Sequence, residues 1–233
     1  MNRFSTILWD VDGTLLDFAY SQKQSLEKCF RSVGRKITAA QLERYSQINE
    51  VFWKRLELGE ITKGQLLTGR FEQFFREYGY EDINLEQFLR EYQEGLGNIY
   101  AYLDDSLGIC KALQGMVSQY VITNGVSSSQ RRKLQLSGLA DLMDGIFVSE
   151  EIGAPKPQPA FFACCLEQIE EKDPGRILVV GDSLSSDIKG GLQAGLSTCW
   201  YRKEGTVNDT PYQPDYEISD LHEILGILSG EDR

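Results

Sequence analysis

The second half of the chain alternates short apolar runs with stretches of helical spacing, and this alternation restricts the possible folds more than any other feature. The clearest run is Ile177-Leu178-Val179-Val180. Further strands are predicted at residues 4–9, 120–123, 145–148, 198–201 and 216–218, and helices at residues 106–113, 127–137, 159–169 and 185–194. Strands that alternate with helices favour parallel pairing through crossover connections. The sequence therefore predicts an α/β fold with a doubly wound, mainly parallel sheet.

A helical insert interrupts this pattern after the first predicted strand. Apolar residues recur at helical spacing from residue 19 to residue 97, for example Phe30 with Val33 and Phe52 with Leu56. Glycines divide this segment into about four helices, and no convincing strand interrupts it. We therefore assign residues 1–16 and 101–233 to an α/β core domain and residues 17–100 to a helical domain.

Charge and residue counts exclude several classes of function. Lys and Arg total 24 against 35 Asp and Glu, so the formal charge is −11. Because proteins bind nucleic acid polymers by neutralising phosphates with Lys and Arg, we expect no such partner. An anionic ligand would need a local feature that overcomes the repulsion of the acidic background, and a bound cation would serve this purpose. The single histidine, His222, precludes a His-rich metal site and is expected to lie on a helix near the C-terminus.

The cysteines and the first residues of the chain favour a cytoplasmic location. The five cysteines are odd in number and form no CxxC pair, so we expect reduced thiols. The N-terminus runs directly into a strand-like segment and lacks the pattern of a signal peptide. No apolar run approaches the roughly 20 residues that a membrane helix needs, so we expect no membrane association.

Three of the predicted strands end in polar residues. The first is followed by Asp10-Val11-Asp12-Gly13-Thr14, another by Thr123-Asn124-Gly125 and a later one by Gly181-Asp182-Ser183. A fourth element, Lys156-Pro157, precedes a predicted helix. Ligands of open parallel sheets bind beyond the carboxyl ends of the strands, so we expect these elements to meet there. Each element alone is typical of a turn, a loop or a helix cap, whereas the four together favour a functional site.

The residue types at these strand ends predict a metal site that handles phosphate. In an extended segment the side chains of Asp10 and Asp12 would share a face, and their mutual repulsion implies that one holds a proton or that a cation neutralises them. Asp182 would supply a third oxygen ligand, and hard oxygen donors suit Mg²⁺. Lys156 would add a mobile positive charge, and the Thr123-Asn124 segment would donate hydrogen bonds. This combination predicts phosphoryl transfer.

The four elements, in this order, resemble the signature of the haloacid dehalogenase (HAD) superfamily of hydrolases, and the helical insert resembles the cap of its C1 subgroup. The resemblance implies a Rossmann-like core. It implies that Asp10 attacks phosphorus to form an aspartyl-phosphate, and that Asp12 protonates the leaving oxygen and then activates water. Asp12 also favours phosphate chemistry, because true dehalogenases of the superfamily lack an acid/base Asp at this position.

The resemblance also implies a ligand set for the metal and the phosphoryl group. Mg²⁺ would be held by the Asp10 carboxylate, the Asp12 backbone carbonyl and Asp182. Asp187 would support that site, directly or through water. The phosphoryl oxygens would be held by Thr123, the Asn124 backbone and Lys156.

Segments beside the signature resemble the pyrimidine 5′-nucleotidase branch, which removes phosphate from nucleoside monophosphates. These segments are residues 12–18, 122–125 and 148–153. Gly13 departs from that branch, which often has a second acidic residue there. Phe18 and Trp53 are candidates to stack on a base, since every base has a π-face. Aromatic residues at helical spacing are, however, usually core residues.

We therefore expect a Mg²⁺-dependent phosphatase whose partner is a small phosphate monoester, in particular a nucleoside 5′-monophosphate. One alternative is a small-molecule phosphatase acting on a sugar phosphate or phosphoglycolate. Another, of a different class, is a non-catalytic binding module that responds to phosphate. We expect a monomer or a homodimer.

Overall fold

The computed structural model describes residues 2–203 and 205–230, and the structural statements below refer to these residues. They divide into two compact units, which lie within Met1–Phe18 plus Tyr100–Arg233 and within Ala19–Ile99. This division falls close to the predicted domain boundaries. That the two units are separate domains stays a prediction.

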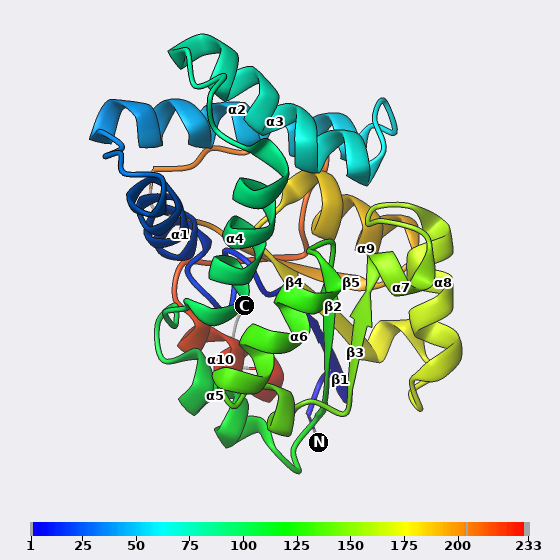
Figure 1. Cartoon of the computed structure of the whole chain (residues 1–233). Coiled ribbons are helices and arrows are strands. Elements are labelled where there is room, and N and C mark those ends of the chain that lie inside the picture. Colours follow the sequence, from blue (N-terminus) through cyan, green and yellow to red (C-terminus); the bar gives the residue numbers. More distant parts are fainter. Residues whose placement is uncertain (1, 204, 231–233) are drawn as a thin grey trace. The chain divides into compact units, whose positions relative to one another are not determined.

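A six-stranded sheet forms the centre of the first unit (Figure 1). Its strands are β1 (Thr6–Trp9), β2 (Ser118–Thr123), β3 (Gly145–Val148), β4 (Ile177–Gly181), β5 (Ser197–Tyr201) and β6 (Tyr216–Ile218). They lie in the order β3-β2-β1-β4-β5-β6, and every neighbouring pair is parallel. This confirms the predicted α/β fold. The strand order reverses at β1, which lies between β2 and β4, and such a position is where open sheets of this kind bind ligands.

Helices cover both faces of this sheet because successive strand residues point to opposite sides. Trp9 packs in one buried cluster with residues of α5 (Ser106–Leu113) and α10 (Ile224–Ser229), whereas its neighbour Leu8 packs in another with residues of α8 (Pro159–Gln168). The α-helices of the unit are α5 (Ser106–Leu113), α6 (Ser127–Leu136), α7 (Ser149–Ile152), α8 (Pro159–Gln168), α9 (Lys189–Gln193) and α10 (Ile224–Ser229). Strands buried on both faces explain why their sequences are continuously apolar.

Two short elements differ from the sequence prediction. The helix predicted at residues 185–194 is a π-helical turn, Leu184–Ile188, followed by the short helix α9. The one-turn helix α7 has no counterpart among the predicted elements. The exposed His222 lies in a 3₁₀ turn, Leu221–Glu223, just before α10.

The second unit consists of the predicted helical insert. Its helices are α1 (Phe18–Ser32), of which Phe18 itself is counted with the first unit, α2 (Ala39–Glu57), α3 (Lys63–Tyr78) and α4 (Leu85–Asn98). Thr38 and Thr62 cap α2 and α3 through reciprocal hydrogen bonds with Gln41 and Gln65. The interior is aromatic and contains Phe30, Tyr45, Phe71, Phe74, Phe88 and Tyr92. These residues explain the helical apolar spacing of the insert.

The structure also bears on the predictions about the cysteines and about membrane-spanning helices. All five cysteines are free, and only Cys164 is not buried. Among the described helices, none combines the length and the apolar character needed to span a bilayer.

Candidate active site

The ends of β1 and β4 bring two of the predicted acidic segments together. The backbone N–H of Asp10 donates to the carbonyl of Val180 at 2.9 Å, so the loop after β1 starts beside the end of β4. The sheet register pairs Trp9 with Val180 and also with Val121. The residues that follow β1, β2 and β4 therefore start at one edge of the sheet.

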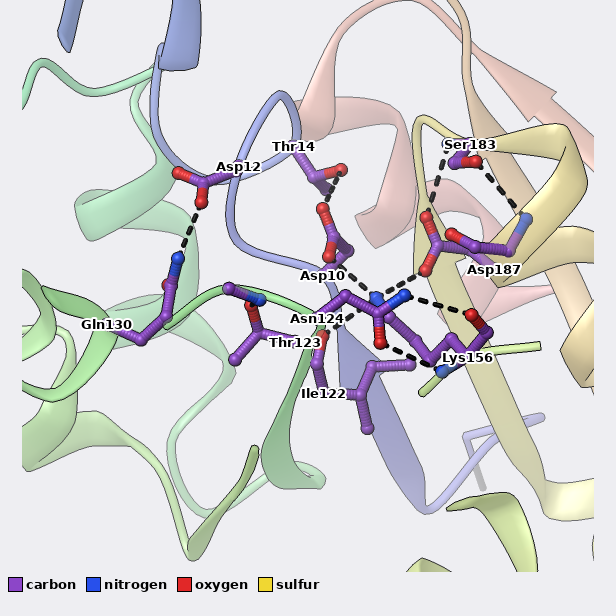
Figure 2. Close-up of polar contacts among 12 residues, drawn as sticks. Asp10, Asp12, Thr14, Ile122, Thr123, Asn124, Gln130, Lys156, Ser183 and Asp187 are labelled. Carbon is purple, nitrogen blue, oxygen red and sulfur yellow. Dashed lines mark hydrogen bonds and ion pairs between the residues drawn. The ribbon is translucent and has the colours of Figure 1, made fainter. Parts of the chain in front are cut away.

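Lys156 is buried at this edge and held by three acceptors. Its ammonium nitrogen lies 2.7 Å from Oδ1 of Asp10, 2.6 Å from Oδ1 of Asp187 and 3.0 Å from the carbonyl oxygen of Ile122 (Figure 2). Asn124 fixes the Lys156 backbone by accepting from its N–H at 2.8 Å and donating to its carbonyl at 2.9 Å. The side chain of Lys156 is 2% exposed. The prediction of a mobile lysine is therefore wrong, because the strand end and the two carboxylates immobilise it.

Three carboxylates gather around this lysine. Oxygen atoms of Asp10, Asp182 and Asp187 lie within 4.8 Å of one another. Asp187 belongs to the π-helical turn after β4, and its Oδ2 accepts from the backbone N–H of Ser183 at 3.2 Å. A Cβ atom at Gly181 would lie 2.3 Å from Cγ of Asp187, so glycine at this position leaves room for the carboxylate.

The electrostatics of the cluster follow from burial and from an excess of acidic groups. Burial raises the pKa of Asp10 well above its usual range; Lys156 opposes this effect, and Asp187 and Asp182 add to it. Burial alone would lower the pKa of Lys156, but the charges of Asp10 and Asp187 raise it above its usual value. The lysine therefore stays charged and is shared by more than one carboxylate.

The side chain of Asp12 points away from this cluster. Its Oδ2 accepts from Nε2 of Gln130 at 2.6 Å, and its Oδ1 is paired with the ammonium of Lys133. The expectation that Asp10 and Asp12 share one face is wrong, because the chain turns sharply between them. Backbone N–H groups of Leu15 and Leu16 donate to the Val11 carbonyl at 3.0 and 2.8 Å. The cluster of three carboxylates thus contains Asp187 where the sequence predicted the side chain of Asp12.

Three further residues that the sequence predicted for the site are Thr123, Phe18 and Trp53. The Thr123 hydroxyl is buried and accepts from the Gly125 N–H at 3.0 Å. Phe18 is half-buried at the start of α1, and Trp53 is half-buried on α2 in the second unit. The Thr14 hydroxyl, which was not predicted, lies 3.4 Å from Oδ2 of Asp10.

Sequence reasoning also missed the basic and amide residues that contact Asp12 and Asp182. Gln130 and Lys133 lie one turn apart on α6, whereas Lys203 follows β5 and places its ammonium nitrogen 3.0 Å from Oδ2 of Asp182. A polar pair at helical spacing just after Thr123-Asn124-Gly125 is the signal that could have identified Gln130 and Lys133.

Comparisons with known proteins identify the family. A family model for haloacid dehalogenase-like hydrolases matches residues 4–195. The putative HAD-hydrolase YfnB of Bacillus subtilis is 36% identical over 99% of this chain and 98% of its own length. A crystal structure of YfnB bound to magnesium superposes with a TM-score of 0.92 at 35% identity and covers 97% of this chain and 99% of that one.

Two further relatives cover nearly the whole chain. The pyrimidine 5′-nucleotidase YjjG of Escherichia coli is 32% identical over 97% of this chain and 98% of its own length. The N-acylneuraminate-9-phosphatase of Rattus norvegicus is 34% identical over 100% of this chain and 96% of its own length. The match to the family model and these full-length relatives agree with the architecture of the sheet and the insert. The chain belongs to the haloacid dehalogenase-like hydrolase family.

Proposed function

We propose that the protein is a magnesium-dependent phosphatase that forms an aspartyl-phosphate on Asp10 and acts on nucleoside 5′-monophosphates. The observation that carries this proposal is the position of Asp10. Its carboxylate lies at the edge of the sheet with Lys156 2.7 Å away and with Asp182 and Asp187 close by. A nucleophilic carboxylate next to a buried cation and further carboxylates suits the transfer of a phosphoryl group.

The residues at this edge fit Mg²⁺. The ion prefers oxygen ligands and often binds through one or two carboxylates plus a substrate phosphate. Asp10 and Asp182 would provide these carboxylates, the Asp12 backbone carbonyl a further oxygen, and Asp187 would support the set. When bound, Mg²⁺ offsets negative charge on the phosphoryl oxygens. A divalent cation also explains how a chain of net charge −11 accepts an anionic substrate.

The residues of the chain account for both chemical steps. An oxygen of Asp10 forms a bond to phosphorus while the bond from phosphorus to the leaving oxygen breaks, and Asp12 gives that oxygen a proton. Asp12 then takes a proton from the water that attacks phosphorus, which releases inorganic phosphate and restores the Asp10 carboxylate. Lys156, Thr123 and the Asn124 backbone N–H hold the phosphoryl oxygens during both steps.

The nucleotide preference rests on two separate supports. YjjG, whose name describes a pyrimidine 5′-nucleotidase, is 32% identical over nearly its whole length. The half-buried rings of Phe18 and Trp53 offer apolar faces on which a base could stack. If Trp53 contacts the base, Trp53→Leu raises KM for a nucleoside monophosphate but leaves KM for glycerol phosphate unchanged.

A second candidate substrate class is a phosphorylated sugar or sugar acid. It is favoured by the rat N-acylneuraminate-9-phosphatase, which is 34% identical over the full length of this chain. The same Asp10 chemistry would serve either class, because the reacting group is a phosphate monoester in both. The two candidates therefore differ in the residues that contact the organic part of the substrate.

A substrate panel with Mg²⁺ or with a chelator tests the proposal. The panel contains pyrimidine and purine nucleoside 5′-monophosphates, N-acylneuraminate 9-phosphate, hexose phosphates and phosphoglycolate. We expect the highest kcat/KM for a nucleoside monophosphate and no turnover with the chelator. A higher value for any other compound would refute the nucleotide preference. Failure to turn over any compound would favour a non-catalytic binding module.

Replacement of the nucleophile tests the chemistry itself. Asp10→Asn should lower kcat by more than about a thousandfold, because an amide cannot replace the nucleophilic carboxylate. Asp141→Asn is the matched control, since Asp141 is exposed and lies outside the cluster of carboxylates. Retained turnover in Asp10→Asn would refute the assignment of the nucleophile.

A further inference from the structure

Two donors from one helix hold both carboxylate oxygens of Asp12. Nε2 of Gln130 donates to Oδ2 at 2.6 Å, and the ammonium of Lys133 pairs with Oδ1. Figure 2 shows Gln130 reaching Asp12 on the side away from Asp10, Lys156 and Asp187. Asp12 therefore has its own pair of partners, separate from Lys156, which contacts Asp10 and Asp187.

The two side chains that donate to Asp12 are both buried, and a buried polar group needs a partner. Gln130 is 2% exposed and Lys133 is 1% exposed. Burial of an amide or an ammonium group is unfavourable unless the group is paired, and the amide nitrogen of Gln130 and the ammonium of Lys133 are paired on the same carboxylate. The amide oxygen of Gln130 has no hydrogen-bond partner among the described residues, so the contact with Asp12 is the one polar contact of this side chain that the structure supplies. The Asp12 side chain itself is 23% exposed, so it keeps access to solvent or to a substrate.

Gly125 provides the space through which Gln130 reaches Asp12. A Cβ atom at Gly125 would lie 2.1 Å from Nε2 of Gln130. Gly125 directly follows Thr123 and Asn124 at the end of β2. Gly125 therefore connects two parts of the site. It belongs to the segment predicted to hold the phosphoryl group, and it packs against the Gln130 side chain of α6, which contacts Asp12.

We propose that Gln130 and Lys133 are positioning residues for Asp12, and that they fix the orientation in which its carboxylate exchanges a proton with the leaving oxygen. The inference rests on the proposed function. One donor on each oxygen restricts rotation about both side-chain torsions of Asp12. Each carboxylate oxygen has two lone pairs, so the group can still share a proton with a third partner. Proton transfer depends strongly on such orientation.

A purely structural role is the competing explanation. In that case Asp12 only neutralises the buried Lys133 and anchors α6 to the loop after β1. Loss of the contact would then disturb the site for every substrate alike. A positioning role instead affects only substrates whose leaving oxygen needs a proton, so the dependence on the leaving group separates the two explanations.

The experiment compares p-nitrophenyl phosphate with p-nitrobenzyl phosphate, which has a similar shape but an alkoxide leaving group. A nitrophenolate departs without protonation, whereas an alkoxide does not. The value of kcat/KM reports the transfer to Asp10, which is the step that expels the leaving group. For Lys133→Met and Gln130→Met we expect kcat/KM to fall about 100-fold with the benzyl ester and less than about threefold with the phenyl ester. Gln130→Met removes no charge and so carries the test if Lys133→Met does not fold.

Matched controls are available on the same helix. Arg131 and Gln135 are exposed on α6, and Arg131 pairs with Glu151 away from Asp12. Arg131→Met and Gln135→Met should leave the ratio of the two kcat/KM values unchanged. In the double variant Asp12→Asn/Lys133→Met, kcat/KM for the benzyl ester should fall no further relative to the phenyl ester than in Asp12→Asn alone. The effects of two substitutions that act through the same group do not add.

The outcomes separate this inference from the proposed function. Equal losses with both esters, or no loss with either, would overturn the positioning role alone. Absence of Asp10-dependent turnover of both p-nitrophenyl phosphate and every compound of the substrate panel by the unsubstituted protein would overturn both the positioning role and the proposed function.

Discussion

The ammonium nitrogen of Lys156 lies 2.6 Å from Oδ1 of Asp187, and both side chains are almost completely buried. The two residues come from different crossover segments of the sheet, so their contact joins the loop before α8 to the turn after β4. Removal of the cation that pairs with a buried carboxylate strongly destabilises the folded protein, because the carboxylate is left buried without an opposite charge. This contact is therefore expected to contribute to stability as well as to the chemistry.

Lys156→Met tests this double role. We expect the free energy of unfolding to fall by about 3–5 kcal/mol, because Asp187 and Asp10 would be left buried without their cation. Urea denaturation measures this change. Lys111 is exposed on α5, so Lys111→Met should change the free energy of unfolding by less than about 0.5 kcal/mol. Equal stability of the two variants would contradict a structural contribution from the Lys156–Asp187 pair.

Magnesium affinity should depend on pH in a defined direction. Burial is the main cause that raises the pKa of both Asp10 and Asp182. A carboxyl group is protonated below its pKa and must be deprotonated to bind a metal, so full affinity exists above the raised pKa values. We expect the dissociation constant for Mg²⁺ to increase as pH falls, by up to about tenfold per pH unit for each carboxylate that takes up a proton.

Calorimetry in buffers of different ionisation enthalpy counts the protons released when Mg²⁺ binds. An affinity that does not weaken as pH falls would contradict the raised pKa values of these carboxyl groups. The Asp141→Asn variant should show the same pH dependence as the unsubstituted protein, because Asp141 is exposed and outside the cluster.

Lys203 should compete with the metal for Asp182. Its ammonium nitrogen lies 3.0 Å from Oδ2 of Asp182, and its side chain is 57% exposed. An ion pair with one exposed partner is worth at most about 1 kcal/mol, so Lys203→Ala should tighten Mg²⁺ binding by up to about fivefold. Arg202→Ala, which removes a neighbouring cation that pairs with Glu217, should leave the affinity unchanged. Weaker binding in Lys203→Ala would show that this competition does not occur.

The sheet and its order of elements were predictable because they rest on local patterns. The strand Gly145–Val148 and the helix Ser106–Leu113 match the sequence prediction residue for residue. The one-turn helix α7 was missed because four residues are too few to show a helical period. The turn Leu184–Ile188 was predicted as ordinary helix, since apolar spacing does not distinguish a π-helical turn from an α-helical one.

The contacts of the candidate site were harder to predict than its residues. Asp10, Lys156 and Asp182 were selected because they follow strands or precede a helix. The polar pair Gln130 and Lys133 could be noticed in the same way, but its contact with Asp12 could not, because the two residues lie 118 and 121 positions further along the chain. The immobility of Lys156 was also missed, because burial of one side chain depends on tertiary packing and leaves no local signal in the sequence.

Gly13 should control the position of Asp182. Its φ is +95°, and a Cβ atom there would lie 2.3 Å from Oδ2 of Asp182. Gly13→Ala should therefore displace that carboxylate and weaken Mg²⁺ binding by at least about tenfold, which calorimetry measures. Gly115 has a φ of +74°, and apart from its chain neighbours no described residue has a heavy atom within 4 Å of the added Cβ. Gly115→Ala should thus lower the free energy of unfolding by about 1–2 kcal/mol, the cost of a left-handed backbone with a side chain, and leave Mg²⁺ affinity unchanged. Unchanged Mg²⁺ affinity in Gly13→Ala would show that Asp182 binds the metal from another position or does not bind it at all.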